Sequence, residues 1–598
     1  MAVARSPRAV VGLLALAIAV AAWSVAPATG ATQASPDPAV ECPPVLPLDQ
    51  VSAGMRGTAV SVTSGRSLSS FSAEVLGVLQ DAVGPGRDII VVDLSGPAVT
   101  AAGGLWAGAS GSPVYFRSGG LDRLAGAIAY GLAGGGSTLA GLTPAQDMYD
   151  VLAIGEDTPS TASVAVPRAL AARMSAASGL SITQTATLSR LKTPLSASGL
   201  TDRGLRSMQA AIDRQGLPFI AYMGSSASNN PPPPTARLRA GDSFAAAMSL
   251  GDVTTAGIGT TTFVCNGKAV AFGHPFNWTG DTTMAIRAAD TITIVKDPIF
   301  GSYKLANIAE SLGTLTQDRL GGIAGSLGTA PVGSPITSSV TDLDLQRTRT
   351  GRSEAIFPDF LPFLAFTHLF QNVDVTIDRI GGGSSEMEYA IHGTRGDGSP
   401  WELLRSTRYA SPDDISFDSV VELGFTAETL QGFEGEDITV TSIDVPKLEV
   451  TKAFQRYDVR RLLVWNGSQY VVREFASARP GRTIRLRAVL RPVNGGATRN
   501  VDLSLKVPQN ARRSGYIEVL GGGSIGPEIP CFIVEDECVE DTDGTFDQLL
   551  NAFKNQPPGD AVVARLRLGD AGVLRAQSSV REDTVVGGRV AIGFLLIR

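Results

Sequence analysis

A tight turn of small residues, from Gly103 to Pro113, lies between segments that have the length and composition of β-strands. At its centre, Gly108-Ala109-Ser110-Gly111-Ser112-Pro113 sets a serine between glycines. Glycine adopts backbone conformations that other residues avoid, so this turn can present a serine with little side-chain bulk around it. The turn therefore favours a strand-rich fold that holds a serine between two strands.

The residues after the turn predict a hairpin followed by a short helix. Residues 114–116 and 123–131 have strand composition and are separated by a glycine-containing turn. Thr143 and Pro144 then suit the N-cap and the first position of a helix that runs to Leu152.

The composition of the whole chain agrees with a mainly β protein. Its 598 residues include 67 glycines and 35 prolines, which favours many short strands and turns over long helices. The length suggests about three or four domains. The net charge is only −7 and no run of Lys or Arg occurs, so a nucleic-acid partner is not expected.

The serine turn and its surroundings resemble the SpoIVB family of bacterial serine peptidases, which have a chymotrypsin-like fold. In that family the serine lies in a Gly-Met-Ser-Gly-Ser-Pro turn, preceded by Gly-Gly and followed by a Val-Gly-Ala strand. The corresponding residues here are Gly103-Gly104, the turn at 108–113 and Ala125-Gly126-Ala127. The stretch at 312–325 also resembles the downstream part of SpoIVB domains.

The resemblance implies roles for several residues. Ser110, rather than Ser112, would be the nucleophile, and the N–H groups of Gly108 and Ser110 would form the oxyanion hole. The strand Ala129-Tyr130-Gly131 would pair with the substrate backbone and wall the S1 pocket. No carboxylate lies near the expected pocket floor, so a Lys or Arg preference is not supported.

A Ser/His mechanism must use one of three histidines, His274, His368 or His392. His274 follows a strand and a glycine, as the histidine of the family does, whereas His368 lies in an apolar run typical of a core. We therefore predict that His274 is the general base, with a midpoint of the pH–rate profile near about 6.5. The serine half then precedes the histidine half, which is the reverse of the order in the family, so we expect a permuted arrangement around one cleft.

The third catalytic residue is predicted with alternatives. The family carries its aspartate at the position that is Ser95 here, and Asp93 lies on the same face of that strand. Asp93 is therefore the predicted third member, and Asp88 and Asp281 are rivals.

Residues 1–31 have the pattern of a signal peptide, with Arg5 and Arg8 before an apolar run at 10–22. The alternative is an uncleaved anchor, although the run is short for a membrane span. No later stretch is long and apolar enough to span, so we expect a secreted or cell-envelope bacterial protein without a stable membrane span after signal cleavage.

Four cysteines suit an oxidising compartment. Cys531 and Cys538 are close in sequence and are predicted to form a local disulfide, which leaves Cys42 and Cys265 as a candidate long-range pair. Apart from His274, nine residues after Cys265, no histidine lies near a cysteine in the sequence. A metal site is therefore not predicted, and no other cofactor is expected.

The expected fold is mainly β: a permuted chymotrypsin-like double β-barrel peptidase with added parts. These parts are a serine-bearing half at 48–155, a helical connector and Pro-rich linker at 156–235, a histidine-bearing half at 236–345, and a β-rich, sandwich-like accessory region at 346–598. The connector is expected to lie outside the barrels, because rejoining two halves needs reach more than burial.

The predicted function is that of a secreted SpoIVB-like serine endopeptidase that acts on proteins or peptides, with self-processing left open. The alternative belongs to a different class, a binding or scaffold protein that keeps a peptidase fold without turnover. The uncertain aspartate and the permuted order both keep this alternative open.

Overall fold

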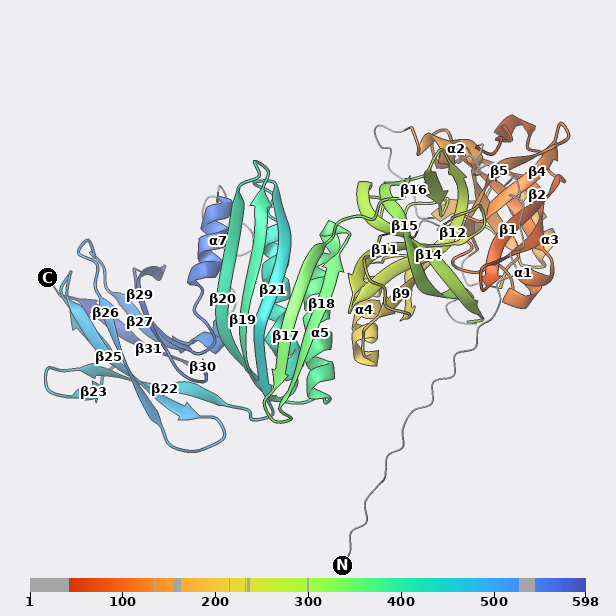
Figure 1. Ribbon diagram of the computed structural model, residues 1–598. Coiled ribbons are helices and arrows are strands. Elements are labelled where there is room, and N and C mark those ends of the chain that lie inside the picture. Colours follow the sequence, from red (N-terminus) through yellow and green to blue (C-terminus); the bar gives the residue numbers. More distant parts are fainter. Residues whose placement is uncertain are drawn as a thin grey trace, which may run out of the picture.

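The computed structural model describes residues 42–132, 136–153, 163–214, 216–231, 233, 237–297, 301–525, 544–569 and 571–597. This part of the chain is mainly β, as expected. Figure 1 shows two neighbouring strand-built units, a central sheet backed by helices, and a pair of sheets at the C-terminal end. The predicted signal peptide and the predicted Cys531–Cys538 pair lie outside the described residues.

The first unit is a sheet that closes on itself, which we call the first ring. Its order is β4-β1-β2-β3-β6-β5, and β5 pairs again with β4. In chain order these strands are β1 (Arg56–Ser64), β2 (Ser67–Gly84), β3 (Arg87–Ser95), β4 (Pro113–Ser118), β5 (Leu121–Gly131) and β6 (Leu139–Pro144). The run Ile89-Ile90-Val91-Val92 is fully buried, because one face of β3 points into the ring and the other is covered from outside.

Three helical elements lie next to the first ring: η1 (Leu48–Gln50), α1 (Pro97–Ala102) and α2 (Ala145–Asp150). The predicted helix begins one residue later than expected, at Ala145, since Thr143 and Pro144 are still part of β6.

The second ring has the order β12-β13-β16-β15-β14-β11, and β11 pairs again with β12. In chain order its strands are β11 (Ser243–Gly251), β12 (Thr254–Cys265), β13 (Lys268–Ala271), β14 (Gly280–Val295), β15 (Tyr303–Arg319) and β16 (Gly322–Leu327). The predicted histidine half extended to residue 345, but the ring ends at β16 because the next strand pairs within the central sheet.

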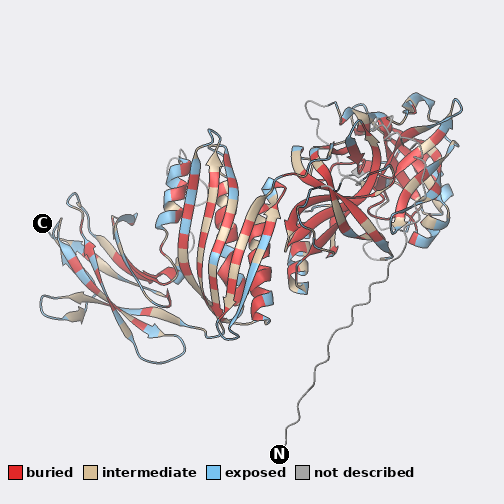
Figure 2. Cartoon of the chain, viewed as in Figure 1, coloured by how far each residue is buried: buried red, intermediate tan, exposed pale blue. Residues whose placement is uncertain are grey.

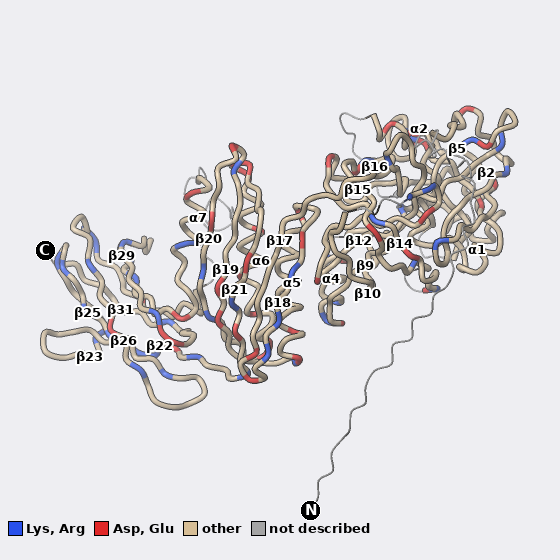
Figure 3. The backbone as a smooth tube through the Cα atoms, viewed as in Figure 1, with Lys and Arg blue, Asp and Glu red and all other residues tan. Residues whose placement is uncertain are grey.

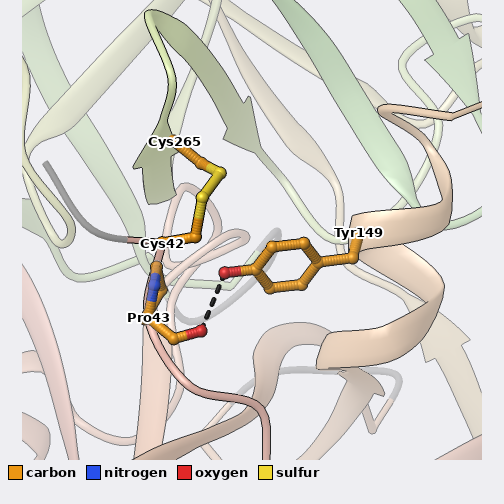
Figure 4. Close-up of a disulfide and its surroundings, with 4 residues drawn as sticks. All are labelled: Cys42, Pro43, Tyr149 and Cys265. Carbon is orange, nitrogen blue, oxygen red and sulfur yellow. Dashed lines mark hydrogen bonds between the residues drawn. A yellow bond between two sulfur atoms is a disulfide. The ribbon is translucent and has the colours of Figure 1, made fainter. Parts of the chain in front are cut away.

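The two rings are joined by a disulfide between Cys42, which precedes the first ring, and Cys265 at the end of β12. Figure 4 shows this bridge beside Tyr149 of α2, whose hydroxyl donates a 2.8 Å hydrogen bond to the Pro43 carbonyl. The Tyr149 ring stacks on Phe263 of β12 at 4.3 Å between centroids. The candidate long-range cysteine pair is thus bonded, and apolar packing surrounds it on both sides of the junction.

The connector belongs to neither closed ring, as expected, but it pairs with the sheets of both. Its strands β7 (Ser163–Ala165) and β8 (Thr187–Arg190) extend the first ring's sheet, and β9 (Thr193–Ser198) and β10 (Phe219–Met223) extend the second. These short strands pair their backbone N–H and C=O groups with strands of the two sheets. Pairing is favoured because unpaired backbone groups that are buried cost free energy. The connector's helices are α3 (Arg168–Ser178) and α4 (Asp202–Arg214).

The accessory region begins with the central sheet, which is continuous with the second ring through pairing of β11 with β18. Two helices, α5 (Leu361–Ile377) and α6 (Ile415–Gln431), pack on it, and Pro362 is accommodated in the first turn of α5. The strands are β17 (Ser334–Asp342), β18 (Arg347–Ala355), β19 (Gly383–Arg395), β20 (Pro400–Ser411) and β21 (Ile438–Thr451), and η2 (Pro358–Phe360) leads into α5.

The last part contains two facing sheets, in agreement with the sandwich-like expectation, which holds for this part rather than for the whole region. One sheet is formed by β22 (Arg456–Trp465), β23 (Tyr470–Val472), β25 (Thr483–Pro492), β26 (Arg499–Lys506) and β30 (Val585–Gly587). The other is formed by β24 (Phe475–Ala478), β27 (Gly515–Gly521), β28 (Ala561–Leu568), β29 (Val573–Arg581) and β31 (Arg589–Leu596).

Burial differs between these parts (Figure 2). Buried residues dominate the strands of the two rings, whereas buried and exposed residues alternate along β25 and β26. Between the paired sheets and the central sheet lies α7 (Phe546–Asn555), preceded by η3 (Gly522–Ser524). Thr545 and Gln548 form the predicted capping box at its start. Among the described residues, no helix has the length and apolar character needed to cross a membrane.

The disulfide yields a prediction about stability. Replacing both Cys42 and Cys265 by serine should lower the free energy of unfolding of the two-ring unit by about 2–4 kcal/mol, because the bridge closes a long loop. The cysteines are 223 residues apart. The melting temperature should fall by roughly 5–10 °C, which calorimetry would measure. Free thiols at both positions in protein exported by its host, found by peptide mapping, would contradict the bridge.

Candidate active site

The serine turn depends on glycines at two positions. Gly108 and Gly111 have φ angles of 89° and 92°, in the region that favours glycine. A β-carbon on Gly111 would lie 1.9 Å from the carbonyl oxygen of Thr260, so no other residue fits there without moving β12. The small residues of the motif are thus required by close contact with the second ring.

Strand β12 of the second ring holds the serine turn through three hydrogen bonds. The Thr260 N–H donates to the Ser110 carbonyl at 2.8 Å, and its hydroxyl donates to the Gly108 carbonyl at 2.9 Å. The Thr262 hydroxyl donates to the Gly111 carbonyl at 2.8 Å. The backbone of the serine turn is therefore fixed by the ring that carries the histidine.

The histidine lies on a sharp turn after β13. Phe272 and Gly273 both have positive φ angles, 70° and 69°, which reverse the chain directly before His274. The Phe272 N–H donates to the Thr260 carbonyl at 3.3 Å, and the hydroxyl of Thr143 in the first ring donates to the Gly273 carbonyl. Both rings thus fix the position of this turn.

The structure brings Ser110 and His274 together across the junction of the rings. Ser110 Oγ lies 2.9 Å from His274 Nε2, within the distance expected for a nucleophile and its base. His274 Nδ1 lies 2.8 Å from the Pro275 carbonyl oxygen, which can only accept. Nδ1 therefore carries the proton, and Nε2 is free to accept one from Ser110. Ser112 is also buried, but its hydroxyl has no hydrogen-bond partner among the described residues.

Both side chains are covered by protein. Ser110 is 2% exposed and His274 is fully buried. Burial, together with the nearby positive charge of Arg190, lowers the pKa of His274 to about 3. The predicted midpoint near about 6.5 assumed an imidazole in contact with water, and the observed burial implies a lower value. In this state His274 is neutral at neutral pH and can act as a base.

The predicted aspartate is not in the dyad. The carboxylate of Asp93 accepts a hydrogen bond of 2.5 Å from the Thr138 hydroxyl, and the Pro275 carbonyl occupies the position beside His274 Nδ1 that a third residue would need. Of the rivals, Asp88 accepts from the N–H of Asp81, and Asp281 pairs with Arg319. Asp93 thus contributes to a contact beside its strand, Asp88 stabilises a turn, and Asp281 forms a surface ion pair.

One functional residue that the sequence analysis missed is Asp318 on β15. Its buried carboxylate accepts hydrogen bonds from the N–H groups of Phe276, Asn277 and Thr279, at 2.6, 2.7 and 3.3 Å. Burial raises its pKa, and these donors oppose that rise. Asp318 is a positioning residue that holds the turn after His274. It lies in the stretch 312–325, whose resemblance to SpoIVB domains was the available signal.

A buried lysine supports the serine turn from behind. Lys304 Nζ donates to the hydroxyls of Thr260 and Ser243, at 3.0 and 3.1 Å. Since Thr260 in turn donates to the Gly108 carbonyl, this chain of hydrogen bonds fixes the peptide at Gly108. Burial lowers the pKa of Lys304 to about 7. The sequence did not indicate this residue, since a single lysine in a strand has no recognisable pattern.

The predicted oxyanion donors are positioned by this support. Within the described part of the chain, the N–H groups of Gly108 and Ser110 donate to no other group. Free N–H groups beside a nucleophile are what an oxyanion hole requires.

The other two histidines lie in the accessory region. His368 is buried in α5 and bonds the hydroxyls of Ser338 and Ser353, both at 2.9 Å, so it is a satisfied core residue. His392 is half-exposed on β19, with Glu402 and Asp444 at 3.4 and 3.7 Å. Neither joins Ser110.

The predicted substrate strand Ala129-Tyr130-Gly131 is already paired. Tyr130 and Gly131 lie opposite Arg190 and Ser189 of β8 in an antiparallel register. The edge that would receive a substrate is thus held by the chain's own connector.

No cluster of three or more metal-binding side chains occurs among the described residues. Figure 3 shows Lys and Arg mixed with Asp and Glu along the central sheet, and more Lys and Arg than Asp and Glu on the paired C-terminal sheets. No family model, curated protein or solved structure matches this chain.

The burial of His274 predicts a flat pH profile. The rate at which a fluorophosphonate labels Ser110 should change little between about pH 5 and about pH 8, since the imidazole stays neutral there. Labelling should decline only in more acidic buffer, as the pH approaches the lowered pKa of about 3. A sigmoidal rise centred near about pH 6.5 would show that His274 is hydrated in the reacting protein.

A second prediction concerns Asp318. Asp318→Asn replaces an acceptor of three N–H groups by an amide, so the turn carrying His274 should shift and labelling of Ser110 should slow by about 10- to 100-fold. Asp281→Asn is the matched control, because the Asp281 side chain is 86% exposed on the adjacent strand. Equal labelling of both variants and the wild type would refute the positioning role, and thermal melts would show whether folding is affected.

Proposed function

We propose that this chain is a SpoIVB-like serine endopeptidase with the two halves of a chymotrypsin-like double β-barrel in permuted order. The observation that carries the proposal is the 2.9 Å approach of Ser110 Oγ and His274 Nε2, two side chains 164 residues apart and on different rings. A chance pairing of these residues would not also place a proton acceptor at Nδ1 and two free N–H groups beside the serine.

The geometry supports a two-step acyl transfer. Ser110 Oγ attacks the carbonyl carbon of the scissile peptide while His274 Nε2 takes its proton. The N–H groups of Gly108 and Ser110 stabilise the oxyanion. The imidazolium then protonates the leaving amine, and water, activated by the same imidazole, releases the acyl group from Ser110.

The Pro275 carbonyl takes the part that a carboxylate has in the usual triad. It selects the productive tautomer, as the carboxylate does, because only an N–H can face it. It carries no full negative charge, so it stabilises the imidazolium less. We therefore expect a slow peptidase rather than an inactive one.

The Cys42–Cys265 bridge supports an extracytoplasmic location, since such bonds persist in oxidising compartments. Protein or peptide chains are the proposed substrates, because the edge of β5 beside the serine pairs with an extended segment, which in this structure is the chain's own connector. The other candidate is a non-catalytic binding protein on a peptidase fold, which the burial of the dyad and the missing carboxylate favour.

The assignment of the nucleophile is tested by labelling with a fluorophosphonate, which reacts with activated serines. Ser110→Ala should abolish labelling, and His274→Ala should slow it by about 10²–10⁴-fold, because the general base is lost. Ser112→Ala is the control for the same turn and should be labelled at the wild-type rate. Labelling that persists in Ser110→Ala would refute the nucleophile, and wild-type protein that never reacts would favour the binding protein.

A further inference from the structure

One edge of β5 is shared by the serine turn and the connector. The Gly111 N–H donates to the Ile128 carbonyl, and the Ile128 N–H donates to the Ser112 carbonyl, at 2.8 and 3.0 Å. At the next residue of β5, the Ala129 carbonyl accepts from the Leu191 N–H at 3.0 Å. Leu191 is therefore the connector residue that pairs beside the serine turn.

The pairing continues along the connector away from the serine. Arg190 lies opposite Tyr130, and Ser189 lies opposite Gly131, in an antiparallel register. An extended segment that binds this edge with its last residue next to the serine has the orientation of a bound substrate. On this basis Leu191 occupies the P1 position, immediately before the scissile bond, and Arg190 and Ser189 occupy P2 and P3.

The side chain of Leu191 lies in an apolar site. It packs against the core of the first ring. A β-carbon on Gly131 would lie 2.9 Å from a methyl group of Leu191 and 2.8 Å from one of Leu105. The absence of a side chain at Gly131 thus leaves the space that Leu191 fills, and Leu105, five residues before Ser110, forms another wall.

The connector residue before Leu191 lies near the histidine. Arg190 is half-buried and lies near enough to His274 for its charge to act on the imidazole. The segment then crosses to the second ring, where Leu195 pairs with Gly257 of β12. The connector therefore crosses the junction of the rings beside the dyad, where Ser110 and His274 are buried.

The segment is bound as a substrate strand but is not held for cleavage. The N–H groups of Gly108 and Ser110 do not donate to the Leu191 carbonyl, or to any other group within the described residues. A substrate must place its P1 carbonyl there to react. This geometry is that of an inhibitor rather than that of a substrate in reaction.

We propose that residues Ser189–Leu191 are a built-in inhibitor that occupies the cleft, and that the site takes substrates with a leucine-sized apolar residue at P1. The proposal rests on the proposed peptidase function. A competing peptide must displace the segment from the β5 edge, so the full-length chain reacts only through the fraction of molecules whose cleft is open.

The central variant is Leu191→Asp, which puts a charge into the apolar site and should release the segment. The rate of fluorophosphonate labelling at Ser110 should rise by about 10-fold or more over the wild type, as the open fraction grows. Ile182→Asp is the matched control, because Ile182 lies on the same connector and is 43% exposed. It should label at the wild-type rate. An unchanged rate in Leu191→Asp would overturn the inhibitory role.

The P1 preference is tested on the released protein. Diphenyl phosphonate probes that carry the side chain of leucine or of lysine react covalently with an activated serine. On Leu191→Asp, the leucine probe should react about 10-fold faster than the lysine probe or more, because the site walled by Leu105 and Gly131 is apolar. Equal rates, or a faster lysine probe, would overturn the stated substrate class.

A third measurement needs no catalysis. In Ser110→Ala protein, hydrogen exchange at the Leu191 amide should be slow, and adding Leu191→Asp should make the amides of residues 189–191 exchange at least about 10-fold faster. Fast exchange in Ser110→Ala itself would overturn occupancy of the cleft. Slow exchange in a protein that never labels at Ser110, with or without Leu191→Asp, would instead show that the proposed peptidase function fails, and the inhibitory role with it.

Discussion

Thr260 is the residue on which the candidate active site depends. Its N–H and hydroxyl bond the serine turn, while its carbonyl accepts from Phe272 at the start of the histidine turn. One residue of one strand thus sets the position of both Ser110 and His274. Thr260 lies on a strand of a closed ring, so these three hydrogen bonds hold the two turns in a fixed relative position. The distance between Ser110 and His274 is therefore set by strand geometry rather than by flexible loops.

The electrostatic surroundings of the dyad are dominated by basic groups. The site has two buried basic groups, His274 and Lys304, and the buried carboxylate of Asp318 is bonded to backbone N–H groups instead of to the imidazole. Burial lowers the pKa of both basic groups, so His274 is uncharged at neutral pH, and the full positive charge beside it is that of Arg190 on the connector. Opening the cleft would hydrate His274 and move its pKa back toward its ordinary value.

The sequence predicted the local features of this site and not the tertiary ones. The glycines at 108 and 111 predicted the serine turn. Positive φ angles and close packing require glycine at these positions, so a single short stretch of sequence shows the requirement. The chain has only three histidines, which limited the choice of general base, and the strand and glycine before His274 favoured that residue. The Pro275 carbonyl could not be foreseen, since any residue supplies a carbonyl. Asp318 lies 44 residues after His274 by sequence number, and only the pairing of β14 with β15 brings it to the turn. Likewise β8 is four residues long and owes its structure to an open sheet edge rather than to its own pattern.

The proposed permuted order of the halves would also account for the connector beside the dyad. A chain that completes the serine-bearing ring first must afterwards cross to the ring that carries the histidine, and the dyad lies at the junction it crosses. Free backbone groups on β5 and β12 border that junction, and pairing with β8 and β9 satisfies them. The crossing segment therefore passes between two sheet edges that flank the serine, where an extended peptide would bind. In the usual order, with the histidine half first, the serine half has no such crossing to make after its own last strand. The order of the halves thus supplies the cleft with an occupant from the same chain, and access to Ser110 depends on how strongly Leu191 and its neighbours hold that position.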